Sequence, residues 1–164
     1  MGRLAWNRTW ALAVVFGLAS VPWTYAFVAG DVPLWPAFIA SATFYATDED
    51  GVAGLQRGYA SNAAGIAYAA ATLALVDALG GGVVTLSVVV GAFMFLASLH
   101  AFVPLLSFTP GGFFGYATLF SVHAAGASAF GLGGLAGETV AAVVSMLAGA
   151  CIGLGTEWLS DRLA

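Results

Sequence analysis

Charged side chains are nearly absent from this 164-residue chain, and their scarcity decides the solvent in which it can fold. Only 7% of the residues are charged, 61% are hydrophobic, and lysine does not occur at all. A soluble protein of this size has too little interior to bury so much apolar surface. The composition therefore predicts an integral membrane protein with a single transmembrane domain, residues 1–164, whose first partner is the lipid bilayer.

Glycine and proline divide the chain into six apolar segments, because its uniformly low polarity leaves no amphipathic period to follow. The four long segments are Trp10–Ala29, about Gly58–Leu79, about Val83–Ala101 and about Leu135–Leu159.

 The segment Trp10–Ala29 contains 20 uncharged residues. This length is enough to cross a hydrocarbon core of about 30 Å at about 1.5 Å per residue. The two short segments are about Leu34–Thr47 and one centred on Ser107–Phe120, which Pro110-Gly111-Gly112 interrupts. The predicted fold class is therefore an all-α integral membrane protein with about six transmembrane segments, two of them short or broken.

The four arginines orient the chain in the membrane. With six crossings and a cytoplasmic N-terminus, all of them fall on the cytoplasmic side: Arg3, Arg8, Arg57 and Arg162. If the two short segments were re-entrant instead, Arg57 would lie outside. The positive-inside rule therefore favours six crossings with both termini in the cytoplasm.

A faint internal repeat relates the two short segments at a spacing of 75 residues. The matching pairs are Phe38 and Phe113, Ala42 and Ala117, and Thr43 and Thr118. Each short segment lies between two long ones, so the halves 1–79 and 83–164 share a long–short–long order and would have opposite topology. Inverted repeats of this kind are typical of channels and transporters. Chance recurrence in a chain rich in alanine, glycine and phenylalanine is the alternative.

Two stretches, residues 35–46 and 105–118, carry a resemblance to a known family. The most specific part is Ser-Phe-x-Pro-Gly-x-Phe-x-Gly, at residues 107–115. From about Ala11 to Trp158 the chain resembles the domain-of-unknown-function 1097 family of small prokaryotic inner-membrane proteins. The resemblance implies a compact multi-span protein in the cytoplasmic membrane of a prokaryote. It implies no reaction, ligand or catalytic residue.

Side chains suited to catalysis or cofactor binding are sparse. His100 and His123 lie 23 residues apart, and neither has a cysteine or carboxylate at metal-ligand spacing. The sequence has no phosphate-binding loop, and it has no basic patch that would bind nucleic acid. We therefore expect no enzyme activity, no cofactor and no metal. The single cysteine, Cys151, lies in an apolar run and is expected in the core.

Polar residues within or beside the apolar segments are the candidate site residues. The candidate solute path consists of Thr43, Ser107, Thr109, Pro110, Gly111, Gly112 and Thr118. Freed backbone groups of a broken helix must be covered by protein or line a wet cavity. The candidate outer vestibule consists of Asp77, His123 and Glu138, and the repeat places Asn62 and Glu138 at corresponding depths. For each residue the alternative is helix packing or a helix-end position at headgroup depth.

Two functions follow from these features. The first is a channel or facilitative transporter for a small neutral or weakly charged solute, such as urea, ammonia, a short carboxylate or water. The alternative is a non-transporting accessory or scaffold subunit of a larger membrane complex. Gly-xxx-Gly pairs begin at Gly111, Gly133 and Gly149, and they permit close helix contact either within the chain or between copies. The small size of the bundle leads us to expect a homo-oligomer or a membrane-protein partner.

Overall fold

The computed structural model describes residues 8–164, in which every regular element is a helix. The elements are α1 (Arg8–Ala29), α2 (Trp35–Ala46), α3 (Gly51–Ala78), α4 (Val83–Ser98), the 3-10 turns η1 (Leu99–Phe102) and η2 (Pro104–Leu106), α5 (Thr109–Ala124) and α6 (Gly134–Leu163). Among residues 8–164, four stretches are long and apolar enough to cross a membrane, namely α1, α3, α6 and the run Val83–Phe102. The chain is therefore an all-helical membrane protein, and α2 and α5 are shorter than the roughly 20 residues that a crossing helix needs.

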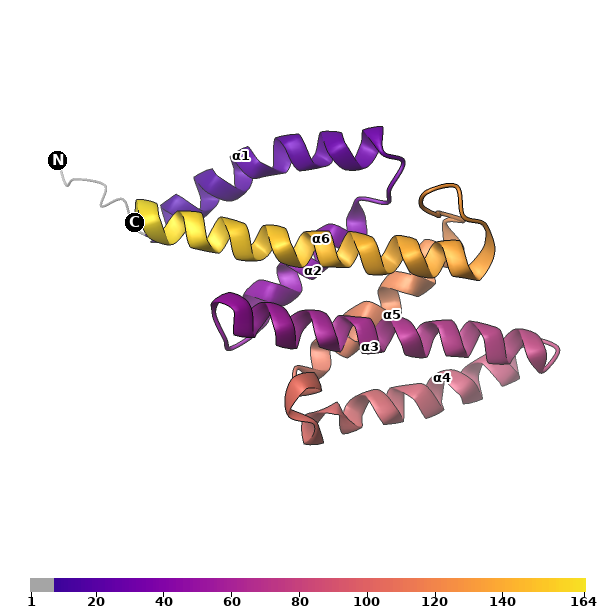
Figure 1. Cartoon of the computed structure of the whole chain (residues 1–164). Helices are drawn as coiled ribbons and strands as arrows, with labels where there is room; N and C mark the ends of the chain where they lie inside the picture. The colour runs from indigo at the N-terminus through magenta and orange to yellow at the C-terminus, as the bar shows by residue number, and fades with distance from the viewer. Residues whose placement is uncertain (1–7) are drawn as a thin grey trace.

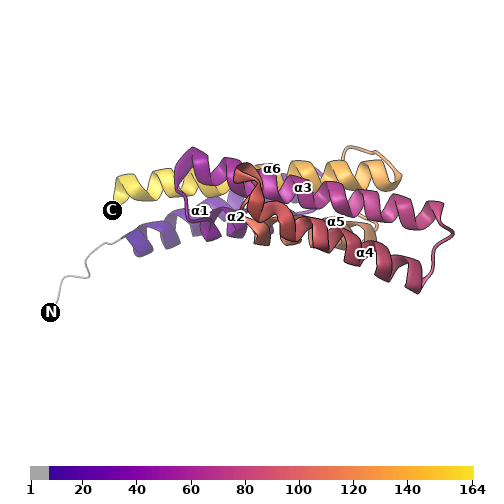
Figure 2. The ribbon, with the colours of Figure 1, turned by 90° about the horizontal axis from the view of Figure 1, so that it is seen from below.

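The helices form two layers. Figure 1 shows α3 and α6 side by side, with α1 beyond α6 and α4 beyond α3. Seen from below, α3 and α6 make one layer and the other four α-helices make the second (Figure 2). Within this arrangement α2 packs mainly on α6, and α5 packs mainly on α3. Each short helix therefore contacts the long helix from the other half of the sequence.

Two glycines allow these close contacts. A β-carbon at Gly65 of α3 would overlap the carbonyl oxygen of Gly112 in α5. A β-carbon at Gly149 of α6 would overlap the carbonyl oxygen of Ala37 in α2. Helix backbones approach this closely in a membrane protein where small residues line the contact. The pairs that begin at Gly111 and Gly149 are thus used within the chain, so they give no separate support for a homo-oligomer.

Two helices are longer than expected. α3 begins at Gly51 rather than near Gly58, and α6 extends to Leu163. The extra turns carry polar residues that stabilise each other, because the Gly51 N–H donates to Glu157 Oε2 at 2.8 Å. As a result Asn62 is the twelfth residue of α3, whereas Glu138 is the fifth residue of α6. The expectation that these two residues lie at corresponding depths is therefore wrong.

The expected break in the fifth segment is also wrong. α5 runs without interruption from Thr109 to Ala124, and Pro110 lies in its first turn, where proline removes no helical hydrogen bond. The irregular backbone comes earlier, in η1 and η2, where α4 has already ended at Ser98. The Pro-Gly-Gly sequence starts a helix rather than breaking one.

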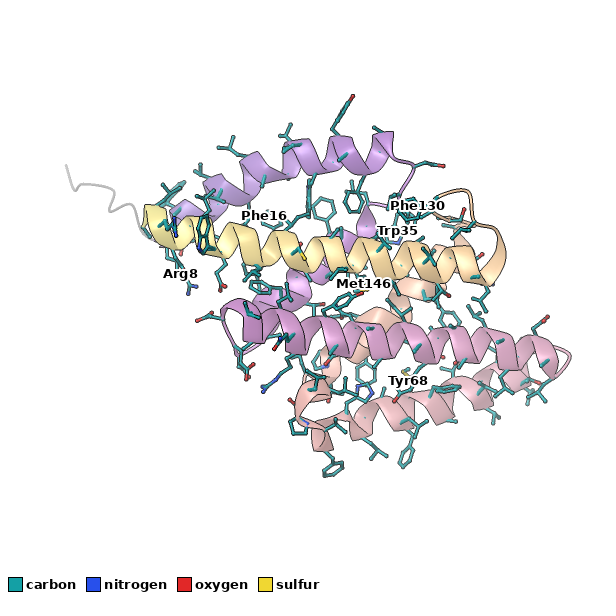
Figure 3. All side chains as sticks on the ribbon, in the orientation of Figure 1. Arg8, Phe16, Trp35, Tyr68, Phe130 and Met146 are labelled. Carbon is teal, nitrogen blue, oxygen red and sulfur yellow. The ribbon has the colours of Figure 1, made fainter. Side chains whose placement is uncertain are left out.

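The core packs around large apolar side chains that are almost completely buried, including Ile66, Leu119 and Met146. Met146 lies on α6 beside α3 (Figure 3). Cys151 is exposed, which contradicts its expected place in the core. The reason is helical geometry, because the neighbouring Gly149 and Ala150 occupy the packed face of α6 and Cys151 is turned away from it.

Candidate functional site

Polar side chains are buried on the four helices that make the central contacts. Their exposed fraction is 0% for Thr43, Ser61, Asn62, Thr118 and Ser145. Several buried atoms have no hydrogen-bond partner within the part of the chain that the structure describes: Ser61 Oγ, Asn62 Nδ2, His100 Nδ1, Thr118 Oγ1 and Ser145 Oγ, with Trp23 Nε1 on α1. An unpaired buried polar group costs about 1–3 kcal/mol, so each one calls for a physical reason.

Asn62 is at the centre of this group. Its Oδ1 lies 3.3 Å from the Thr43 hydroxyl of α2, while its Nδ2 has no acceptor. On the other side, Gly115 allows α5 to lie directly on the Asn62 backbone. Asn62 therefore connects α2, α3 and α5 at mid-length of α3.

The first turn of α5 borders three residues that each carry an unpaired atom. A β-carbon at Gly111 would lie 2.9 Å from Ser61 Cβ and 3.4 Å from Asn62 Oδ1. A β-carbon at Gly112 would lie 3.1 Å from His100 Nδ1. The two glycines thus bring the start of a helix against a serine, an asparagine and a histidine, and we call Ser61, Asn62 and His100 the polar cluster.

His100 is held from one side only. Its Nε2 is 3.1 Å from the Tyr68 hydroxyl, and the two rings lie 5.4 Å apart. Tyr68 projects from α3 toward α4, where it also contacts Phe93 (Figure 3). The imidazole is 3% exposed and its Nδ1 faces Gly112. One nitrogen is therefore fixed by Tyr68, and the other is free to bind a partner.

The structure brings some of the expected path residues together. Thr43 and Gly111 both lie against Asn62, and the next residue, Gly112, lies against His100. Thr118 is buried farther along α5, and its hydroxyl has no partner.

The other expected path residues lie at the edge of this group. Ser107 and Thr109 are half-buried beside η2, and the Ser107 hydroxyl donates to the Pro104 carbonyl at 2.9 Å. Pro110 is exposed. These residues support the start of α5 rather than border Asn62.

Two of the three expected vestibule residues lie within hydrogen-bond distance of each other. His123 Nδ1 at the end of α5 is 2.7 Å from Glu138 Oε2 near the start of α6. Asp77 is exposed near the end of α3, at the same end of the molecule (Figure 1). His123 and Glu138 thus join two helix ends, and Asp77 adds a second acidic position at that end.

The opposite end holds a charged cluster that sequence reasoning missed. Arg8 lies beside the end of α6 (Figure 3), with its Nε 2.8 Å from Asp161 and its Nη2 3.4 Å from Glu157. Glu157 is only 7% exposed, and it borders a cavity of about 230 Å³ together with Tyr45 and other residues. Nothing in the sequence distinguishes Glu157 from other charged residues at headgroup depth.

Sequence reasoning also missed Ser61 and His100 as site residues. A signal for this site did exist, because Asn62 is the only asparagine and His100 the only histidine within an apolar run. Nothing in the sequence showed that the first turn of α5 would pack against both Asn62 and His100.

A comparison with protein families gives one match. The model described as "Protein of unknown function (DUF1097)" matches residues 13–161, which include the whole of α2, α3, α4 and α5. Curated proteins and solved structures give no match.

Proposed function

The chain belongs to the DUF1097 family, whose description names no activity, and we propose that it is a channel or facilitative transporter for a small solute. The observation that carries the proposal is the polar group around Asn62, which is buried at mid-length of α3 and in which several atoms have no hydrogen-bond partner among the described residues. Polar residues inside a membrane bundle are costly and commonly mark solute pathways. A passing solute would supply the missing partners.

An inverted repeat supports this proposal. Ala37 and Gly112, which are 75 residues apart, both lie in the first turn of their short helices. They contact Gly149 and Gly65, which are 84 residues apart. α1 and α4, the first helices of the proposed halves, run in opposite directions (Figure 1). In inverted-repeat transporters the solute site lies between the halves, beside helices that do not span the full membrane.

Other pairs at the same spacing support the repeat. Thr72 and Thr156 are 84 residues apart, and each shares a hydrogen bond with a tyrosine hydroxyl from the opposite short helix, Tyr116 and Tyr45 respectively. A third pair at this spacing is in mutual contact, because the Tyr59 hydroxyl lies 3.3 Å from the carbonyl oxygen of Val143. Equivalent residues touch each other where a two-fold axis passes between them.

The proposed orientation is six crossings with both termini in the cytoplasm of a prokaryote. Arg8, Arg57 and Arg162 lie near the starts of α1 and α3 and the end of α6, which share one end of the molecule (Figure 1). The positive-inside rule assigns that end to the cytoplasm. The His123–Glu138 pair then lies at the outer face.

The test is reconstitution of the pure protein in liposomes, followed by stopped-flow light scattering with a panel of small solutes. We expect one solute to permeate well above empty liposomes. Thr118→Val should reduce this flux without loss of stability, because the buried hydroxyl it removes has no partner. Ser87→Ala, on an exposed face of α4, is the control and should leave flux unchanged.

Unchanged flux in Thr118→Val would remove Thr118 from the path. A flat response to the whole panel, from folded protein, would overturn transport. It would favour the accessory-subunit function, for which reproducible co-purification with one larger membrane protein is the evidence to seek.

A further inference from the structure

The polar cluster offers hydrogen-bond donors to a ligand and no carboxylate. Ser61, Asn62 and His100 are 0%, 0% and 3% exposed, and the unpaired atoms are Ser61 Oγ, Asn62 Nδ2 and His100 Nδ1. An amide nitrogen only donates, and a hydroxyl does so readily. When the Tyr68 hydroxyl donates to His100 Nε2, the ring proton stays on Nδ1 and makes it a donor as well.

The start of α5 adds positive potential at the same place. This 16-residue helix begins at Thr109, and its N-cap residue Phe108 provides no side-chain hydrogen bond. The N-terminus of a helix carries a partial positive charge that favours anions. Gly111 and Gly112 have no side chains that would separate this terminus from the polar cluster. A group that accepts hydrogen bonds and carries negative charge fits these surroundings.

We propose that the polar cluster binds the carboxylate of a short monocarboxylate, with acetate as the probe, and this assignment rests on the proposed transport function. Ammonium and amines are poor ligands here, because the cluster offers them no carboxylate partner. His100 belongs to the 3-10 turn η1, at the end of the apolar run Val83–Phe102. Displacement of this short turn would open the buried site.

The second half of the chain lacks an equivalent cluster. At the spacing of 84 residues, Ser61 corresponds to Ser145 but Asn62 corresponds to Met146. At the spacing of 75 residues, His100 corresponds to Tyr25. Met146 is buried in the apolar core, and Tyr25 is 76% exposed. The inverted halves therefore provide a single carboxylate site in each chain.

The test compares three small probes of different charge: acetate, its neutral isostere acetamide, and methylammonium. Thermal unfolding of the purified protein in detergent, at fixed ionic strength, gives the affinity for each probe. We expect acetate to stabilise the protein most and methylammonium not at all. Ser61→Ala and Asn62→Leu should each weaken acetate binding roughly tenfold, which is the effect of losing one good hydrogen bond to a charged group. Ser145→Ala, the matched serine in the other half, should bind acetate as the wild type does.

Acetate flux in liposomes separates this inference from the proposed function. If acetate binding and acetate flux both fall in Ser61→Ala, the result supports the carboxylate site and the transport function. Permeation of acetamide or another solute, without acetate binding, overturns the carboxylate assignment and leaves transport standing. Acetate binding without permeation of any solute supports the site and overturns transport. Because Asn62→Leu alters the core, Ser61→Ala is the deciding variant, and unchanged acetate binding in it overturns the site.

Discussion

At the scale of single residues, glycines decide how closely the helices can approach. Gly65 and Gly149 each face a backbone carbonyl oxygen of a short helix, which cannot move aside as the end of a flexible side chain can. Gly155 is on the same helix as Gly149, but a β-carbon there would have no atom within 4 Å. Identical substitutions at these positions therefore have different physical consequences.

Gly65→Ala and Gly149→Ala should each lower the free energy of unfolding by about 1–3 kcal/mol, because the added methyl group forces two backbones apart. Gly155→Ala should be neutral or slightly stabilising, since alanine favours the helix and the space is open. Thermal unfolding in detergent measures all three variants. Equal stability of Gly149→Ala and Gly155→Ala would mean that the α2–α6 contact is looser than described.

At the scale of elements, Glu157 connects three helices. Its carboxylate accepts the Gly51 N–H at the start of α3 at 2.8 Å, and it lies 3.4 Å from Arg8 at the start of α1. The Glu157 side chain is only 9% exposed, whereas those of Arg8 and Asp161 are 57% and 49% exposed. Exposed ion pairs contribute little to stability, but an unpaired buried N–H is costly.

Glu157→Ala should therefore destabilise the protein by about 1–3 kcal/mol, because the Gly51 N–H loses its acceptor. Asp161→Asn is the matched control at the same end of α6, and it should cost less than about 1 kcal/mol. Thermal unfolding compares the two variants, and limited proteolysis reports whether α1 separates from α6. If Asp161→Asn proves the more harmful, the Arg8–Asp161 pair is the main connection.

At the scale of the whole molecule, the question is how often the chain crosses the membrane. Four helical stretches are long enough to cross by themselves, while α2 and α5 begin beside the middle of α6 and α3 respectively. Six crossings place the α2–α3 loop inside and the α3–α4 loop outside. Re-entrant short helices would reverse both positions, and they would require α3 to run opposite to α1, whereas both helices start at the same end of the molecule (Figure 1).

Single cysteines in a Cys151→Ala background distinguish these topologies. Asp48 and Leu79 are exposed in the α2–α3 and α3–α4 loops, so both accept a cysteine. With six crossings, an impermeant maleimide applied to intact cells should label Leu79→Cys, and it should label Asp48→Cys only after permeabilisation. Labelling in the opposite pattern would establish four crossings. Ser128→Cys is outside in both topologies and serves as the positive control.

The sequence alone predicted the helical membrane class, the family and the approximate position of all six helices. It could do so because uncharged runs of sufficient length have few stable alternatives to a helix in lipid, where every backbone group needs a partner. The sequence also indicates Thr43 and Thr118 as candidates, because hydroxyl groups stand out in such apolar runs.

The tertiary structure decided which polar groups meet. Ser61, Asn62 and His100 come together because Gly111 and Gly112 lie against α3 and beside η1, a contact between segments about 50 residues apart in sequence. It also showed that Pro110 begins α5 and that Cys151 faces outward. Local composition cannot give these results, because in a uniformly apolar chain the packing of small residues determines which face of each helix turns inward.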